Sequence, residues 1–434
     1  MTHFGLVCVP MPSHLNTMLS LGRELRQRGH HVTLSGLVDT QPLAVEAGVD
    51  FCAFGESTFP SGAIAECVAQ QGILSGIAVW KQLNLWAEKW VAAFCEDMPD
   101  RFRQLGVEAL LVDAGALEGG TVAELLGLPF ATINNSVLIN EEPNIPHSCT
   151  PWHYNPTLWS RWRNQLGYAF FNFLDRAYFQ TLFRYRRKWN LPIYSGYNKY
   201  LSPLAQLSQM PVEFEFPRAA LPPWCHFTGL YNRSTLREPI SFPYEQLTGQ
   251  PLIYASMGTL LNGQMGIFHQ IASACEALDV QLVISLGQKT NSQPHLDLPG
   301  SSIVVGYAPQ LELLKKASLV ITHGGLNTTL ESLYNGVPLV AIPISYDQPG
   351  VAARLVWTGA GEAVCLSRLS VPRLRTAIKR VLSEVSYKNN ANRLQKALHR
   401  LGGVAQAADI VEQMAATREP ILAGFHQNSS KYHH

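Results

Sequence analysis

The sequence predicts an α/β protein with two doubly wound, parallel-sheet halves. Its 434 residues are more than one hydrophobic core usually holds, which indicates two or three domains. Short apolar runs alternate with amphipathic helical stretches, as in a sheet that helices cover on both faces. The alternation begins again at residue 251 after a stretch of different composition, so the architecture is repeated although the sequence is not.

The first half opens with the apolar run "FGLVCVP", which predicts a buried strand. An amphipathic helix is expected over residues 16–28, because Met18, Leu21 and Leu25 share one face and Gly29 can close it. Four further apolar runs predict strands, namely "HVTLSG", "VDFCAF", "ALLVD" and "PFATIN". Runs this continuous are typical of parallel strands that are covered on both faces.

The region 152–200 differs in composition, because aromatic and basic side chains are interleaved there. It contains Trp152, Trp159, Trp162, Trp189, Arg161, Arg163, Arg176, Arg184, Arg186, Arg187 and Lys188. A proline-rich stretch and a polar stretch follow, and they predict an interdomain linker at 232–250.

The second half repeats the pattern of the first. Five apolar runs predict its strands, namely "PLIYASMG", "QLVISLG", "SIVVGY", "LVITHGG" and "PLVAIPIS". We therefore expect one Rossmann-like domain at 1–231 and another at 251–400, joined by the linker. A C-terminal helix at 401–424 is expected to return to the N-terminal domain, and the polar tail at 425–434 is expected to be disordered.

Composition excludes several classes of protein. The formal net charge is +1, with 33 basic and 32 acidic side chains, so the chain has no global attraction to nucleic acid. The N-terminus lacks the basic start and cleavage site of a signal peptide, and no run reaches the roughly 18 apolar residues of a spanning helix. None of the eight cysteines forms a CxxC pair, so neither a zinc site nor a redox motif is indicated. A cytoplasmic protein with reduced thiols is the simplest interpretation.

The stretch "LVITHGGLNTTLE" at 319–331 predicts a phosphate site. Ligands bind beyond the carboxyl ends of parallel strands, and Gly324 and Gly325 let the backbone approach a ligand there. We expect Asn327 or Thr328 to cap the helix that follows. Its first-turn amides and its dipole attract an anion, and His323 adds a side-chain donor beside them.

Neighbouring strand ends carry groups that suit the rest of a nucleotide sugar. Glu331 lies one turn beyond the phosphate site, where its carboxylate can accept hydrogen bonds from ribose hydroxyls. Tyr307, in "GYAPQ", offers an aromatic ring for base stacking. Asp347 and Gln348 can bind several sugar hydroxyls, and "YASMGTL" adds Ser256, Gly258 and Thr259.

The run "YAPQLELLKKASLVITHGGLNTTLESLYNGVPLVAIPISYDQP" resembles the nucleotide-sugar signature of the UDP-glycosyltransferases of glycosyltransferase family 1, in the inverting GT-B superfamily. The resemblance implies a GT-B fold, with the active-site cleft between an acceptor-binding N-terminal domain and a donor-binding C-terminal domain. It implies that Tyr307 takes the uracil-stacking place usually held by Trp. The donor site that it implies comprises Ser256, Gly258, Thr259, Tyr307, Ala308, Gln310, His323, Gly325, Asn327, Thr328, Glu331, Asp347 and Gln348.

The catalytic candidates lie in the first half. His14, in "PMPSHLNT", is expected in the loop just before the first helix, at the ligand edge of the sheet, where a neutral imidazole can accept a proton. The resemblance places the catalytic histidine there and implies that Asp113 hydrogen-bonds to it; without it, Asp113 could equally be a helix cap. No DxD triplet occurs, so we expect no metal and no cofactor, with the UDP-sugar as co-substrate.

The acceptor is less well defined by the sequence. Residues 152–200 could cover the first sheet, line an apolar acceptor pocket or rest on a membrane surface. "LGLPFATINNSVLINEEPNIP" and "SPLAQLSQMPVEFEFPRAALPPWCHFTGLY" resemble stretches of bacterial zeaxanthin glucosyltransferases. That resemblance implies glucose transfer from UDP-glucose to zeaxanthin. A phenol, sterol or polyketide acceptor is the alternative.

Three other classes of protein fit the sequence less well. A nucleotide-sugar epimerase shares the two-domain architecture, but it usually presents carboxylates in the cleft where this chain has His14. A dinucleotide oxidoreductase needs GxGxxG after the first strand, and this sequence has "PMPSHLNT" there. A binding protein with a dead site is disfavoured because His14, Asp113, His323 and Glu331 are all present.

Overall fold

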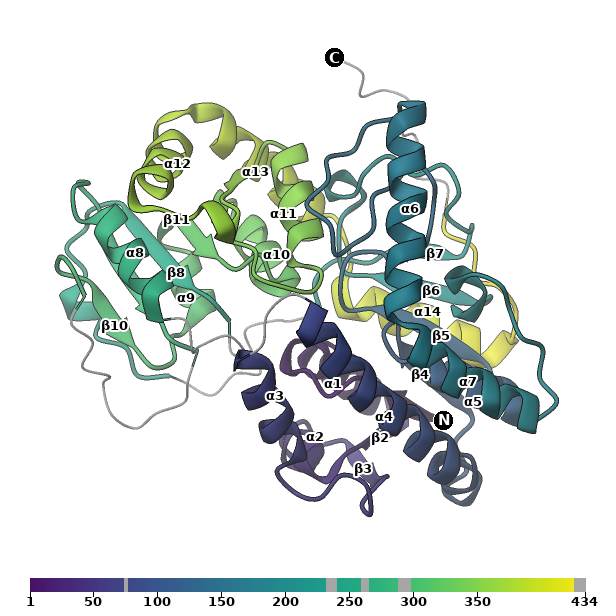
Figure 1. Cartoon of the computed structure of the whole chain (residues 1–434). Coiled ribbons are helices and arrows are strands. Elements are labelled where there is room, and N and C mark those ends of the chain that lie inside the picture. Colours follow the sequence, from purple (N-terminus) through teal and green to yellow (C-terminus); the bar gives the residue numbers. More distant parts are fainter. Residues whose placement is uncertain (74–76, 232–239, 259–264, 288–297, 425–434) are drawn as a thin grey trace.

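The computed structural model describes residues 1–73, 77–231, 240–258, 265–287 and 298–424. The chain forms two α/β halves, each built on its own parallel sheet (Figure 1). The predicted tail at 425–434 and the first part of the predicted linker, 232–239, lie outside the described residues.

The N-terminal sheet has seven parallel strands in the order β3-β2-β1-β4-β5-β6-β7. Leu6 in β1 pairs with Leu34 in β2 and Leu111 in β4, so this apolar row crosses the centre of the sheet. The strands are β1 (His3–Val7), β2 (His31–Gly36), β3 (Asp50–Ala53), β4 (Ala109–Asp113), β5 (Phe130–Asn134), β6 (Ala205–Ser208) and β7 (Cys225–Phe227). The five predicted strands are all present, and β6 and β7 are additional.

Helices cover both faces of this sheet. On one face lie α1 (Pro12–Gln27), α2 (Gln41–Glu46) and α14 (Gly403–Thr417). On the other lie α4 (Ile77–Leu105), α5 (Leu117–Leu126) and α7 (Arg176–Lys188), against which α6 (Leu158–Leu174) packs, while α3 (Ala63–Ile73) borders the cleft. The side chains on the two faces of the sheet therefore belong to two separate hydrophobic cores.

Helix α1 begins earlier than predicted. Pro12 occupies its first turn, because the fixed φ of proline suits the start of a helix and the missing N–H has no partner to lose there. The amide of His14 donates to the carbonyl of Met11 at 3.0 Å, so His14 lies in the first helical turn and not in the preceding loop. The prediction of a loop position was wrong.

The C-terminal sheet has six parallel strands in the order β10-β9-β8-β11-β12-β13. They are β8 (Leu252–Ser256), β9 (Gln281–Ser285), β10 (Ile303–Val305), β11 (Ala317–Thr322), β12 (Leu339–Ala341) and β13 (Gly361–Ala363). All five predicted strands are present, and β13 is additional. Helices α8 (Met265–Cys275) and α12 (Val371–Ser383) cover one face, and α9 (Gln310–Leu314), α10 (Leu326–Tyr334), α11 (Gln348–Trp357) and α13 (Val385–His399) cover the other.

The end of the chain packs against the N-terminal half. Arg28, the C-cap residue of α1, donates to Asp409 at 2.6 Å and to Glu412 at 2.9 Å, both in α14. Beyond α14, the amide of Ile421 donates to the carbonyl of Leu204 beside β6 at 2.8 Å. Figure 1 shows the yellow α14 beside β5 and β6, within the N-terminal half.

The two halves are joined by polar contacts, one buried and one at the cleft. Arg354 of α11 donates to Glu215 of the N-terminal half at 2.7 and 2.9 Å, and both side chains are almost inaccessible to solvent. At the cleft, the side-chain Nδ2 of Asn327 donates to the backbone carbonyl of Ser13 at 3.1 Å. The carboxyl ends of the two sheets consequently face each other.

No helix in the described ranges is both long and apolar enough to cross a bilayer.

Candidate active site

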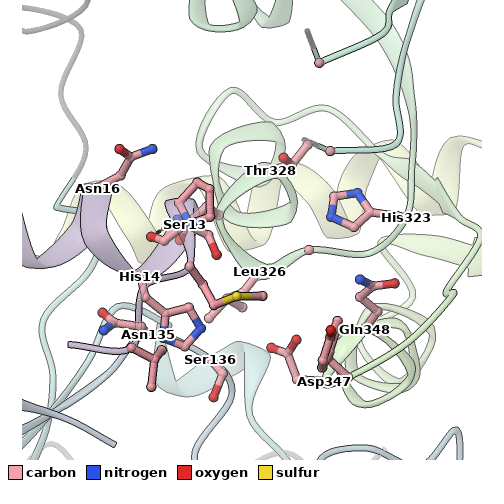
Figure 2. A pocket seen from close by; sticks show the side chains of 18 of the residues that line it. Ser13, His14, Asn16, Asn135, Ser136, His323, Leu326, Thr328, Asp347 and Gln348 are labelled. Atoms are coloured by element: carbon pink, nitrogen blue, oxygen red, sulfur yellow. Dashed lines mark hydrogen bonds between the residues drawn. The ribbon is translucent and has the colours of Figure 1, made fainter. Parts of the chain in front are cut away.

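A cavity of about 520 Å³ lies between the two halves. Its walls come from α1 and the loop after β5 on one side, and from the ends of β8 and β11 and the starts of α10 and α11 on the other. Figure 2 shows His14 and Asn135 on one side, with His323, Asp347 and Gln348 opposite them. A cavity of this size is typical of a small-molecule site.

His14 and Asp113 form a pair at the N-terminal wall. The His14 Nδ1 lies 2.7 Å from the Asp113 Oδ2, although 99 residues separate the two in sequence. His14 is 22% exposed and lines the cavity, whereas Asp113 is 1% exposed and lies behind it. Asp113 is not a helix cap, because α5 begins four residues later at Leu117, and its N-cap residue is Ala116, with no side-chain cap. From the end of β4, Asp113 therefore orients the His14 ring through this contact.

Electrostatics keep Asp113 ionised. Burial alone raises the pKa of Asp113, but the His14 ring beside it and hydrogen bonds from His14 and Gly115 lower the pKa below its usual value. The Gly115 amide donates to the Asp113 Oδ1 at 3.0 Å. An ionised carboxylate only accepts hydrogen bonds, so the His14 Nδ1 donates to it and the Nε2 of a neutral His14 carries the free lone pair.

The same contact changes the basicity of His14. Burial lowers the pKa of His14, yet the charge and hydrogen bond of Asp113, with a smaller contribution from Asp347, raise it above its ordinary value. The ring is therefore a better proton acceptor than a free histidine, and its orientation is fixed by the carboxylate.

Helix α10 opens toward the cavity with free backbone amides. Its N-cap is Gly325, and no side chain caps it. The prediction that Asn327 or Thr328 is the cap was wrong, because the helix begins at Leu326 and both residues lie inside its first turn. The amide of Thr329 is the first to bond within the helix, to the Gly325 carbonyl at 3.0 Å. The amides before it have no partner inside the helix, which suits an anion.

His323 is packed between two glycines. A Cβ on Gly258 would lie 2.8 Å from its ring, and a Cβ on Gly325 would lie 2.5 Å from its Nε2. Burial lowers the pKa of His323 to about 4, so the ring is neutral at physiological pH. The glycines are therefore required by the close approach of this ring, and His323 brings hydrogen-bonding capacity without positive charge.

Glu331 is held in a chain of hydrogen bonds along one wall. The side-chain Nε2 of Gln310 donates to the Glu331 Oε2 at 2.5 Å, and the Tyr254 hydroxyl donates to the side-chain Oε1 of Gln310 at 3.1 Å. Glu331 is 2% exposed, and it is one of the residues that line the cavity. The predicted ribose-binding pair Gln310 and Glu331 is thus brought together by direct contact.

Asp347 and Gln348 lie at the start of α11, opposite His14. The Gln348 side-chain oxygen accepts from the amides of Ile344 and Ser345 at 2.9 and 3.0 Å. Its amide nitrogen is consequently the group left for a ligand. Burial raises the pKa of Asp347, and the nearby His14 partly opposes that rise.

The remaining predicted donor residues line the same cavity. Ser256, Gly258, Tyr307, Ala308, Gly325, Asn327 and Thr328 all belong to its walls. Thr259 lies outside the described residues. The structure therefore gathers every described member of the predicted donor set around one space, with Asp113 directly behind it.

The apolar end of the cavity was not predicted. It is formed by helices α3 and α4, through Ile64, Val68, Leu83, Trp86 and Ala87. Of the described residues that line the cavity, none belongs to 152–200, and α7 within that segment covers α4 and α5 instead. The helical spacing of Leu83, Trp86 and Ala87 was the available signal, but a buried helix face has the same pattern.

A buried carboxylate holds this apolar wall in place. Glu118 accepts from the Trp90 indole nitrogen at 2.7 Å and from the Tyr178 hydroxyl at 2.6 Å. Trp90 in turn stacks on Trp86, with ring centroids 5.1 Å apart. Burial raises the pKa of Glu118, with hydrogen bonds from Tyr178 and Trp90 opposing the rise.

Within the described ranges, no three His, Cys, Asp or Glu side chains gather as a metal site would require.

Two facing parallel-sheet halves with a cleft between them define the GT-B class of glycosyltransferases. The solved structure of CalG4, the calicheamicin glycosyltransferase, matches this chain with a TM-score of 0.75 at 19% identity, covering 97% of this chain and 100% of that one. The kitacinnamycin glycosyltransferase matches with a TM-score of 0.69 at 23% identity, covering 95% and 98% of the two chains. These likenesses concern the fold.

The chain belongs to the UDP-glucoronosyl and UDP-glucosyl transferase family, whose pattern it matches over residues 92–403. It is 33% identical to the zeaxanthin glucosyltransferase of Pantoea ananas over 427 residues, covering 98% of each chain. It is 32% identical to the zeaxanthin glucosyltransferase of Pseudescherichia vulneris, covering 97% of this chain and 100% of that one. The protein is therefore a glycosyltransferase.

Proposed function

We propose that this glycosyltransferase moves glucose from UDP-glucose to a hydroxyl group of an apolar acceptor, with inversion at the anomeric carbon, and that the acceptor is the carotenoid zeaxanthin. The observation that carries the proposal is the position of His14. Its ring is fixed by Asp113 at 2.7 Å and lines the same cavity as the uncapped first turn of α10. A base and an anion site thus border one space.

The proton transfer follows from the tautomer. With Nδ1 donating to Asp113, the Nε2 of His14 accepts the proton of the acceptor hydroxyl. The acceptor oxygen then forms a bond to the anomeric carbon while the bond from that carbon to the diphosphate oxygen breaks. A single in-line displacement of this kind inverts the sugar.

The leaving group gains negative charge as it departs. The free amides at the start of α10 and the helix dipole stabilise that charge, as backbone donors do in an oxyanion hole. His323 is neutral, so it serves as a hydrogen-bonding and packing group rather than as a cation. No step in this scheme uses a metal ion or a cofactor.

The acceptor assignment rests on two supports. Ile64, Val68, Leu83 and Trp86 give the cavity an apolar end, which suits an acceptor that is poorly soluble in water. The two relatives named as zeaxanthin glucosyltransferases align with nearly the whole chain. Another apolar alcohol, such as a phenol, sterol or polyketide, is the second candidate, because the same wall would accept it.

The test is an incubation of the purified protein with radiolabelled UDP-glucose and zeaxanthin. We expect a labelled carotenoid glucoside, identified by mass spectrometry, and an inverted anomeric configuration by NMR. Conversion of the donor into an epimer without acceptor would instead indicate an epimerase. An unchanged donor with zeaxanthin and with a panel of phenols, sterols and polyketides would overturn the proposal.

A further inference from the structure

Helix α6 has an apolar face that points to solvent. Its inner face consists of Ser160, Asn164, Gly167 and Phe171, which are buried. Six other apolar side chains of the helix are 50–76% exposed, namely Leu158, Trp159, Trp162, Leu166, Phe170 and Phe173. At 100° per residue these six fall within an arc of roughly 120°, opposite the buried face. The helix therefore presents one continuous apolar stripe to solvent, formed by four aromatic side chains and two leucines. Figure 1 shows where α6 lies in the N-terminal half.

Cationic side chains border this stripe. Arg161 and Arg163 flank the arc on its two sides, and α6 carries no Asp or Glu. The Arg176 guanidinium lies 4.4 Å from the centre of the Phe173 ring, at the far end of the stripe. Large apolar side chains edged by arginine are typical of helices that lie in a membrane interface.

The surrounding segment concentrates positive charge. Residues 151–200 contain eight Lys and Arg side chains and one acidic one, Asp175, which gives a formal charge of +7 in a chain whose total is +1. Arg186 of this set is buried and paired with Glu124, but Arg161, Arg176, Arg184, Arg187, Lys188 and Lys199 are exposed. The remainder of the chain is consequently acidic, so the charge asymmetry singles out this face.

We propose that the exposed stripe of α6 docks the protein on an anionic lipid bilayer, with the helix lying in the plane of the interface. The apolar arc would enter the boundary between headgroups and acyl chains, and the bordering cations would meet the lipid phosphates. A second copy of this chain is a poorer occupant, because two faces that each carry the same positive charge repel one another. The charge of the face thus selects an anionic lipid over self-association.

The inner face of α6 supports a wall of the active-site cavity. Phe171 stacks on His147 with ring centroids 3.9 Å apart, and the next two residues, Ser148 and Cys149, line the cavity. One helix diameter, about 10 Å, therefore separates the docking stripe from this wall. The next step of the inference rests on the proposed function. Docking would place the cavity beside the lipid bilayer, in which an apolar acceptor dissolves.

The first experiment measures cosedimentation with vesicles of phosphatidylglycerol and phosphatidylcholine, and with phosphatidylcholine alone. We expect the wild-type protein to bind the anionic vesicles preferentially and to be released by salt. The triple variant Trp162→Ser/Leu166→Ser/Phe170→Ser should bind about tenfold less or weaker still. Its matched control is Val45→Ser/Val385→Ser/Leu422→Ser, which removes apolar residues that are 64–69% exposed elsewhere and should bind as the wild type does.

Three outcomes would overturn the docking: no binding of the wild-type protein, equal binding of the triple variant, or a wild-type dimer in light scattering that the triple variant abolishes. A kinetic comparison separates this proposal from the proposed function. The triple variant should retain its turnover of a water-soluble phenol and lose turnover of zeaxanthin held in anionic vesicles. Vesicle binding without sugar transfer to any acceptor would refute the function and leave the docking standing.

Discussion

The N-terminal and C-terminal halves share one architecture but present different chemistry to the cleft. The N-terminal half contributes side chains, chiefly His14 with Asp113 behind it. The C-terminal half adds side chains such as His323 and Gln348, but its anion site is main chain, at Gly325 and the uncapped start of α10. A side-chain site is lost by one truncation, whereas a main-chain site changes only when the backbone or its close packing changes. Substitutions in the first half should therefore act on kcat, and those in the second half on donor affinity.

The largest effect is expected for His14→Ala. Without the imidazole no group is positioned to take the acceptor proton, so kcat should fall roughly 10²–10⁴-fold while the KM for the donor stays nearly constant. Steady-state kinetics with a purified acceptor would measure both. His153→Ala, at an exposed histidine, is the matched control. A His14→Ala enzyme that retains more than about a tenth of wild-type kcat would contradict the role of base.

Substitutions at the junction between the halves are expected to change the stability of the protein rather than its catalysis. Arg354→Met removes the two hydrogen bonds that the buried Glu215 accepts from Arg354 and leaves only the Arg218 Nε, 3.6 Å away, beside the carboxylate. The free energy of unfolding should therefore fall by about 3–5 kcal/mol. The double variant Glu215→Gln/Arg354→Met should recover part of that loss, since the buried carboxylate is then replaced by a neutral amide. Denaturant unfolding measures both. Arg26→Met, which removes an exposed ion pair with Asp50, should cost no more than about 1 kcal/mol. A similar cost for the two single variants would mean that the buried pair does not hold the halves together.

Asp113→Asn separates the orientation of His14 from its presence. Asp113 raises the pKa of His14, so its replacement should lower that pKa. The base would then stay unprotonated to lower pH, and the acidic limb of the kcat/KM profile should move down. We also expect kcat to fall about 10²-fold, because the ring loses its fixed tautomer. Asp50→Asn, at an exposed carboxylate, should leave the profile in place. An unshifted limb in Asp113→Asn would show that another group controls the pH dependence.

The smallest effect is expected in the C-terminal half. In Gly325→Ala the new Cβ would lie 2.5 Å from the His323 ring, which Gly258 already confines from another direction. The ring or the start of α10 must shift, and UDP affinity should fall about tenfold, the equivalent of an overpacking cost of 1–3 kcal/mol. Calorimetric titration with UDP measures this change. Gly266→Ala, where a Cβ meets nothing within 4 Å, is the control. Unaltered UDP affinity in Gly325→Ala would place the diphosphate elsewhere.

The fold was largely predictable because buried parallel strands are apolar over their whole length. All ten strands expected from apolar runs are present. The three that were missed have only three or four residues each and include polar or small ones, as in "AQLS" of β6 and "GEA" of β13. Gly361 in β13 has a physical reason, since a Cβ there would lie 2.1 Å from the Leu339 carbonyl oxygen. Pairing and backbone proximity define these strands, and neither is visible in a short sequence window.

The donor side and the acceptor side of the site also differed in how far the sequence could predict them. The donor residues are close in sequence and follow strand ends, so His323, Asn327 and Glu331 could be assigned to one ligand before the structure. Asp113 could be paired with His14 only through resemblance, because 99 residues separate them. The apolar wall of α3 and α4 was missed, because its composition is that of a helix packed in a core. Its exposure to the cavity depends on where neighbouring helices stop.

The return of α14 to the N-terminal half has a consequence for protein engineering. The polypeptide crosses between the halves twice, once before β8 and once before α14, whose contacts with Arg28 complete the first core. A chimaera that exchanges donor specificities between relatives therefore needs two splice points, with the last helix kept from the parent of the acceptor half. A single crossover would combine an acceptor half with a final helix from another protein. The apolar face of the N-terminal sheet would then be poorly covered.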